Sequence, residues 1–131
     1  GTLTRADDDV AAFSSRGPTS VDGLVKPDIL SPGVNITAAN APGSALDKAA
    51  VPHVGTGYIT ISGTSMATPI MAGVIATILS ANPNLTPAQV KEIFMSTADP
   101  LAGVDANSQG SGVVDAQEAL QRALALKEAV A

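Results

Sequence analysis

Gly63-Thr64-Ser65-Met66-Ala67-Thr68-Pro69 is the stretch that decides how this chain folds. The strand-like residues Tyr58–Ile61 precede it, and a long apolar segment that begins at Ile70 follows it. The change from one pattern to the other predicts a strand that ends before Gly63 and a helix over about residues 64–80. Because almost every face of that helix is apolar or small, we expect it to be buried.

Ser65 falls in the first turn of the predicted helix, where backbone N–H groups have no acceptor within the helix. Together with the positive end of the helix dipole, the Ser65 N–H is suited to hold negative charge beside the hydroxyl. A nucleophile next to such a donor is half of an acyl-transfer site. The position alone is also explained by helix capping, because serine is among the commonest N-cap residues.

Four segments carry a resemblance to a known family. The stretch Gly63–Pro69 resembles the nucleophile motif of subtilisin-like serine proteases, the subtilase family. Phe13–Pro18 resembles the family's Phe-Ser-x-x-Gly segment, and Lys26–Ile36 resembles Lys-Pro-Asp-x-x-Ala-Pro-Gly-x-x-Ile, with Ser31 where alanine is usual. Gly110–Ala116 resembles the Gly-x-Gly-x-Val-Asn/Asp-Ala element near the end of the catalytic domain. The four segments occur in the family's order.

Three other motifs of that family are absent from the sequence. The family's catalytic residues follow the order Asp, His, oxyanion Asn and Ser, and the Asp-Thr/Ser-Gly, His-Gly-Thr-His and Ala-Gly-Asn segments that carry the first three do not occur here. We therefore interpret residues 1–131 as the C-terminal part of one subtilase catalytic domain. The implied fold class is α/β: the C-terminal portion of the subtilisin-like three-layer fold, with a parallel sheet flanked by helices and a buried central helix that starts at the nucleophile serine.

The resemblance also assigns roles around Ser65, which it implies is the nucleophile. Met66 would border the leaving-group side and would be open to oxidation. Phe13 would lie near the same side, although its residue type suits a core aromatic equally well. Three further residues would line the oxyanion site and substrate cleft: Ser62, Gly63 and Thr64.

Acidic residues raise the question of a metal ion. Asp28 aligns with an aspartate that contacts a weak cation site in some subtilases, although an aspartate that hydrogen-bonds its own turn explains it as well. The triplet Asp7–Asp9 suggests calcium, but it lacks EF-hand spacing, and we favour a solvated turn. The implied chemistry requires no cofactor, and a structural calcium ion would belong to the intact enzyme.

The chain contains one histidine, His53, twelve residues before Ser65. Its neighbours do not match the family's histidine motif, so we expect a surface loop residue, with a lone Ser–His pair as the alternative. Lys26 and Lys48 lie in predicted loops, where nothing buries them to lower their pKa, so we do not expect Ser–Lys catalysis.

Composition excludes several classes of function. The net charge of −5 without a basic cluster argues against nucleic-acid binding. The absence of cysteine excludes disulfides and thiolate metal sites but leaves the compartment open, secretion being most common in the family. The longest apolar run, around Ile70–Leu79, is too short to span a bilayer, so we expect no membrane association.

The remaining elements follow from local signals. Thr86 as N-cap and Gln89 form a capping box, with Pro87 at the first helical position, and this predicts a helix reaching about residue 98. Asp115 caps a last helix over 116–128. Residues 39–57 are expected to form a long loop. Short strands are expected at residues 1–5, 10–14, 28–30, 34–37 and 113–114.

These observations and the resemblance predict a serine endopeptidase that hydrolyses peptide or protein substrates through an acyl-enzyme on Ser65. The chain alone is expected to be inactive without the N-terminal catalytic segment. The alternative is a non-catalytic fragment that self-associates or binds a partner through an apolar face and a sheet edge. An α/β-hydrolase esterase is disfavoured, because Ala67 breaks the Gly-x-Ser-x-Gly elbow and no histidine follows Ser65.

Overall fold

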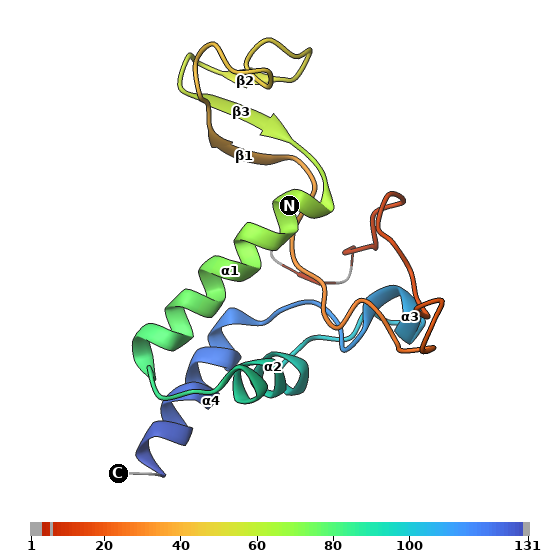
Figure 1. The fold of residues 1–131 in the computed structure, drawn as a ribbon, viewed down its shortest axis with the longest axis vertical. Coiled ribbons are helices and arrows are strands. Elements are labelled where there is room, and N and C mark those ends of the chain that lie inside the picture. The colour runs from red at the N-terminus through yellow and green to blue at the C-terminus, as the bar shows by residue number, and fades with distance from the viewer. Residues whose placement is uncertain (1–3, 6, 130–131) are drawn as a thin grey trace.

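The computed structural model describes residues 4–5 and 7–129 and is shown in Figure 1. A small sheet lies beyond the N-terminal end of the long helix, and two other helices lie toward its opposite end. The elements of the described residues are β1 (Ile36–Ala39), β2 (His53–Val54), β3 (Tyr58–Ile61), α1 (Thr64–Ala81), α2 (Pro87–Ser96), α3 (Ala106–Gln109) and α4 (Ala116–Glu128).

The three strands form one antiparallel sheet in the order β1-β3-β2. Ile36 pairs with Ile61, and Tyr58 lies between Ala39 and Val54. This sheet is not the parallel sheet that the resemblance implies, and parallel pairing among the described residues is limited to the bridge between Leu30 and Val113. The physical reason is connectivity: the chain folds back between β1 and β3 without the crossover that parallel neighbours need.

The predicted strand and helix on either side of Gly63 are confirmed as β3 and α1, but the expected burial of the helix is wrong. Ile78 is the one α1 residue that is fully buried. Apolar side chains on all faces need packing partners on all faces, and α1 packs mainly against α4 along one side. Much of the rest of the helix surface is open (Figure 1).

Helix α1 is also longer than the apolar run Ile70–Leu79, whose short length was the reason to expect no membrane association. Its 18 residues are long and apolar enough to cross a membrane by length and composition alone. The core helix of a soluble protein meets the same description, so this property does not by itself place the helix in a bilayer.

The main core lies where α1, α2 and α4 meet, and it joins six buried residues: Ile78, Ile93, Phe94, Val114, Ala119 and Ala123. The two alanines are completely buried and allow α4 to approach α1 closely. The buried Asn82 Nδ2 donates to the Ala123 carbonyl at 3.0 Å, which ties the end of α1 to α4. Ile93 and Phe94 supply the buried side of α2, whereas Leu124 in α4 is exposed.

Both predicted helix starts are confirmed. The Thr86 side chain accepts from the Gln89 N–H while the Gln89 side chain accepts from the Thr86 N–H, so the capping box is complete. Asp115 accepts from the Glu118 N–H at 2.8 Å. The strand expected at 10–14 is absent from the structure, and part of the one expected at 1–5 lies outside the described residues.

The Gly-x-Gly element owes its glycines to close backbone packing. Gly110 has a φ of 63°, and a side chain there would meet the backbone of Pro27 and Asp28. Gly112 has a φ of 126°, and a side chain there would meet the backbone of Asp99. This contact places Val113 between Leu30 and Asp99, which it bridges on either side.

Candidate active site

Ser65 lies exposed in the first turn of α1, directly after the strand β3. Gly63 is the N-cap residue in an extended conformation, and its carbonyl accepts from the N–H groups of Met66 at 3.0 Å and Ala67 at 3.3 Å. Within the described part of the chain, the N–H groups of Thr64 and Ser65 have no hydrogen-bond acceptor. The Ser65 hydroxyl therefore stands beside an unpaired amide at the positive end of an 18-residue helix.

The segment 33–35 holds the turn that carries Ser65. The Gly63 N–H donates to the Gly33 carbonyl at 2.8 Å, and the Asn35 N–H donates to the Ser62 Oγ at 2.8 Å. Asn35 has a φ of 53°, a left-handed conformation that asparagine tolerates better than most residues. Sequence reasoning did not assign Gly33 and Asn35 to the site. The Pro-Gly pair and the asparagine in that segment were the available signals.

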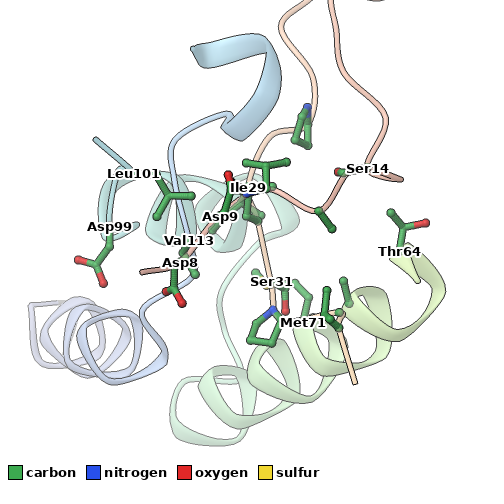
Figure 2. Close-up of a pocket in the computed structure, with 18 of the residues that line it drawn as sticks. Asp8, Asp9, Ser14, Ile29, Ser31, Thr64, Met71, Asp99, Leu101 and Val113 are labelled. Atoms are coloured by element: carbon green, nitrogen blue, oxygen red, sulfur yellow. Dashed lines mark hydrogen bonds between the residues drawn. The ribbon is translucent and has the colours of Figure 1, made fainter. Parts of the chain in front are cut away.

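A hollow of about 1160 Å³ opens beside the first turns of α1 (Figure 2). Three of the residues predicted for the cleft line it: Phe13, Gly63 and Thr64. Ser62 and Met66 lie outside its lining, with Met66 half-buried and its sulfur close to Gly63. In Figure 2, Thr64 and Ser14 mark one side of the hollow, and Ile29 and Met71 lie between them and the aspartates of the other side. Phe13 is 52% exposed, so its place is in this lining and not in the core.

The other side of the hollow is acidic and is balanced by one arginine. Arg5 Nε donates to Asp99 at 3.2 Å, Nη1 contacts Asp8 at 3.4 Å, and Nη2 donates to the Val114 carbonyl at 3.0 Å. Asp9 accepts from the Val10 N–H at 2.7 Å. These contacts are those of an ion-paired turn, and the described residues hold no group of three or more His, Cys, Asp or Glu side chains suited to a metal ion.

The geometry around Asp28 suits lysine ammonium groups and not a metal cation. One carboxylate oxygen lies 2.6 Å from Lys26 Nζ and the other lies 3.0 Å from Lys91 Nζ. Hydrogen bonds from Lys26, and next from Lys91, hold the pKa of Asp28 below its ordinary value. Because each oxygen faces an ammonium group, the two lysines balance the charge of the carboxylate and link the loop to α2.

His53 lies exposed in β2, on the sheet and not in a loop, and its ring is turned toward its own segment. Nδ1 lies 2.9 Å from the Val51 carbonyl, and Nε2 lies 3.4 Å from an Asp47 carboxylate oxygen. Both ring nitrogens are therefore engaged away from Ser65. A general base must be within hydrogen-bond reach of the hydroxyl whose proton it takes, and His53 is not placed for that role.

Ser65 itself lies outside the lining of the hollow, which its neighbours Gly63 and Thr64 line. An exposed serine beside an unpaired amide in the first turn of a helix is the arrangement that the nucleophile half of a serine-dependent acyl-transfer site requires. The sequence model described as "Subtilase family", Peptidase_S8, matches residues 2–117. The chain belongs to the subtilase family.

Named relatives agree with this assignment. The chain is 51% identical over 120 residues to the serine protease AprX of Bacillus subtilis (strain 168), which covers 91% of this chain and 27% of AprX. It is 44% identical over 90 residues to the subtilisin-like protease SBT3.9 of Arabidopsis thaliana, covering 68% of this chain and 11% of that protein. The chain thus spans about a quarter or less of the length of these relatives.

Solved structures show the same fold. Fervidolysin from Fervidobacterium pennivorans, a keratinolytic enzyme related to subtilisin, superposes with a TM-score of 0.67 at 30% identity, over 85% of this chain and 16% of fervidolysin. The CspB protease of Clostridium perfringens superposes with a TM-score of 0.66 at 26% identity, over 87% of this chain and 24% of CspB. The described elements are therefore part of a subtilisin-like α/β fold.

Proposed function

We propose that this chain supplies the nucleophile of a serine endopeptidase that cleaves peptide bonds in peptides or proteins. The observation that carries the proposal is the exposed Ser65 with its unpaired amide at the start of α1. Family membership and the proteases among its relatives support the same reaction.

In the proposed reaction, the Ser65 oxygen attacks the carbonyl carbon of the peptide bond and a base takes the hydroxyl proton. The carbonyl oxygen becomes negative and is stabilised by the Ser65 N–H. The C–N bond then breaks, the leaving amine takes the proton from the protonated base, and an acyl-enzyme remains on Ser65. Water releases the acyl group by the reverse sequence of proton transfers. These steps require no cofactor.

The base and its orienting carboxylate are proposed to come from a polypeptide segment outside these 131 residues. A serine hydroxyl is a weak nucleophile without a base, and His53 is engaged with Val51 and Asp47 instead. Loss of the histidine from a subtilisin site lowers turnover about 10⁶-fold. We therefore expect the isolated chain to be inactive or nearly so on peptide substrates.

A chimera tests the proposal. Residues 1–120 of this chain replace the matching segment of AprX, and the purified chimera is assayed with a fluorogenic peptide. We expect activity in the chimera, loss of that activity in Ser65→Ala, and activity close to that of the chimera in His53→Ala. A folded chimera without activity would overturn the assignment of Ser65.

The isolated chain provides the matched experiment. Turnover by the chain alone that disappears in Ser65→Ala and persists in His53→Ala would show that another residue of this chain serves as base. Turnover that disappears in both variants would show that His53 is the base despite its contacts with Asp47.

Self-association is a second candidate for the isolated chain, favoured by the exposure of α1. Many apolar residues of this helix are open to solvent, and β1 is an edge strand of the sheet. Apolar surface and an unpaired strand edge both promote association between copies. Sedimentation velocity over a range of concentrations tests this candidate, and a monomer at all concentrations would exclude it.

A further inference from the structure

The segment between β1 and β3 is organised around the carboxylate of Asp47. One carboxylate oxygen accepts from Asn40 Nδ2 at 2.5 Å and faces His53 Nε2 at 3.4 Å. The other accepts from the Gly43 N–H at 2.8 Å. Ser44 Oγ accepts from the Asp47 N–H at 3.1 Å, which fixes the backbone that presents this carboxylate. We call the contacts of Asp47 with Asn40, Gly43 and His53 the clasp.

His53 faces two acceptors, one on each ring nitrogen. The Val51 carbonyl lies 2.9 Å from Nδ1, and the Asp47 carboxylate lies on the Nε2 side. A neutral imidazole carries one N–H, so it can donate to only one of these acceptors and must turn a lone pair toward the other. The imidazolium ion carries two N–H groups and can donate to both. The arrangement therefore fits the protonated ring better than the neutral one.

Asp47 and His53 are the two titratable members of the clasp. Hydrogen bonds from Asn40 first, then from Gly43, and more weakly from His53, hold the pKa of Asp47 below its ordinary value, so this carboxylate remains negative. Histidine is the side chain that ordinarily changes charge between pH 5 and 8. Among the described residues, Lys48 follows Asp47 in the chain and forms no ion pair, and Tyr58 pairs with Val54 next to His53.

We propose that the clasp is a pH-sensitive device that fastens the 40–54 segment to the sheet when His53 is protonated and releases it when His53 is neutral. Because His53 lies in the sheet, the device acts on the strand β3. His53 pairs with Ile59 in β3, and β3 continues directly through Gly63 to Ser65. Fastening the segment stabilises one of the two strands that flank β3. This proposal is independent of the reaction proposed for Ser65.

Nuclear magnetic resonance of the 131-residue chain tests the proposal, because its only histidine gives one set of ring signals. The ring signals of His53 and the amide signals of Gly43 and Asp47 are followed from pH 5 to pH 8. We expect the amide signals to shift in the same transition as the ring. Amide signals that stay constant while the ring titrates would overturn the proposal, and this result needs no variant.

Two variants and a matched control sharpen the test. In Asp47→Asn and in His53→Gln, the amide of Gly43 should show no transition between pH 5 and pH 8. In Lys48→Gln, which changes a charge next to Asp47 outside the clasp, the transition should persist. Persistence of the Gly43 transition in Asp47→Asn would overturn the proposal, and the Ile59 amide signal serves to check that each variant is folded.

Discussion

Gly33 and Gly63 are joined through their backbones, with the Gly63 N–H donating to the Gly33 carbonyl at 2.8 Å. A Cβ atom at Gly33 would lie 2.9 Å from the Gly63 carbonyl oxygen and 3.1 Å from the Ala67 Cβ. That carbonyl is the one that accepts the first hydrogen bonds of α1. The segment before β1 therefore holds the turn from which Ser65 projects, and it does so at a distance that excludes a side chain.

Gly33→Ala should disturb this turn. Forcing a methyl group into a close backbone contact costs about 1–3 kcal/mol of unfolding free energy. In the AprX chimera, the displaced turn should also lower kcat for peptide hydrolysis by a larger factor than it raises KM. Urea denaturation and steady-state kinetics measure the two effects.

The control for that substitution is Gly73→Ala. Gly73 lies within α1, and a Cβ atom there meets nothing within 4 Å. Because alanine favours helix more than glycine does, this variant should be stabilised by about 0.5–1 kcal/mol. Equal destabilisation of both variants would contradict the role assigned to Gly33.

Ile78→Ala should cause a large loss of stability. Ile78 has no exposed surface and joins α1 to the core shared with α2 and α4. Truncation of the Ile78 side chain leaves a cavity and should lower the free energy of unfolding by about 2–5 kcal/mol. Val21→Ala is the matched comparison, because Val21 is 99% exposed and its truncation should leave the urea midpoint almost unchanged.

Thr86→Ala should weaken the start of α2. The Thr86 side chain accepts from the Gln89 N–H, and its removal leaves that donor without its cap. We expect the free energy of unfolding to fall by about 1 kcal/mol. Thr86→Ser keeps the hydroxyl and should retain most of the stability, so denaturation curves that place the serine and alanine variants together would argue against the capping role.

Asp28→Asn should destabilise the protein in a pH-dependent way. Lys26 and Lys91 lower the pKa of the folded-state carboxylate, so its stabilising effect is present above the ordinary aspartate pKa of about 3.9 and is lost as the pH falls through the lower folded value. The difference in stability between Asp28→Asn and the parent chain should therefore be visible at pH 7 and should shrink below about pH 4. A difference that is constant with pH would exclude this charge effect.

Local signals predicted several elements of this protein well. The change from alternating to helical pattern at Gly63 gave both β3 and α1, and the capping residues Thr86 and Asp115 gave the starts of α2 and α4. These features depend on backbone groups and side chains a few residues apart, so the sequence contains the whole interaction. For the same reason, Ser65 could be placed in the first turn of a helix.

The burial of α1 and the contacts that hold the turn before Ser65 could not be predicted from local signals. The sequence of α1 is apolar on every side, which indicates that it can be buried but does not identify its packing partners. Likewise, the Pro32-Gly33 pair and Asn35 indicate a turn, but they do not indicate that Gly33 and Asn35 bond to the residues just before Ser65.

The helix that begins at Thr64, with the Ser65 hydroxyl in its first turn, could be read from the sequence, because a helix start and a hydroxyl are local properties. The backbone that holds that turn and the acceptors around His53 became known from the folded chain. Such contacts join residues that are distant along the chain, and their geometry exists only after the segments have packed together.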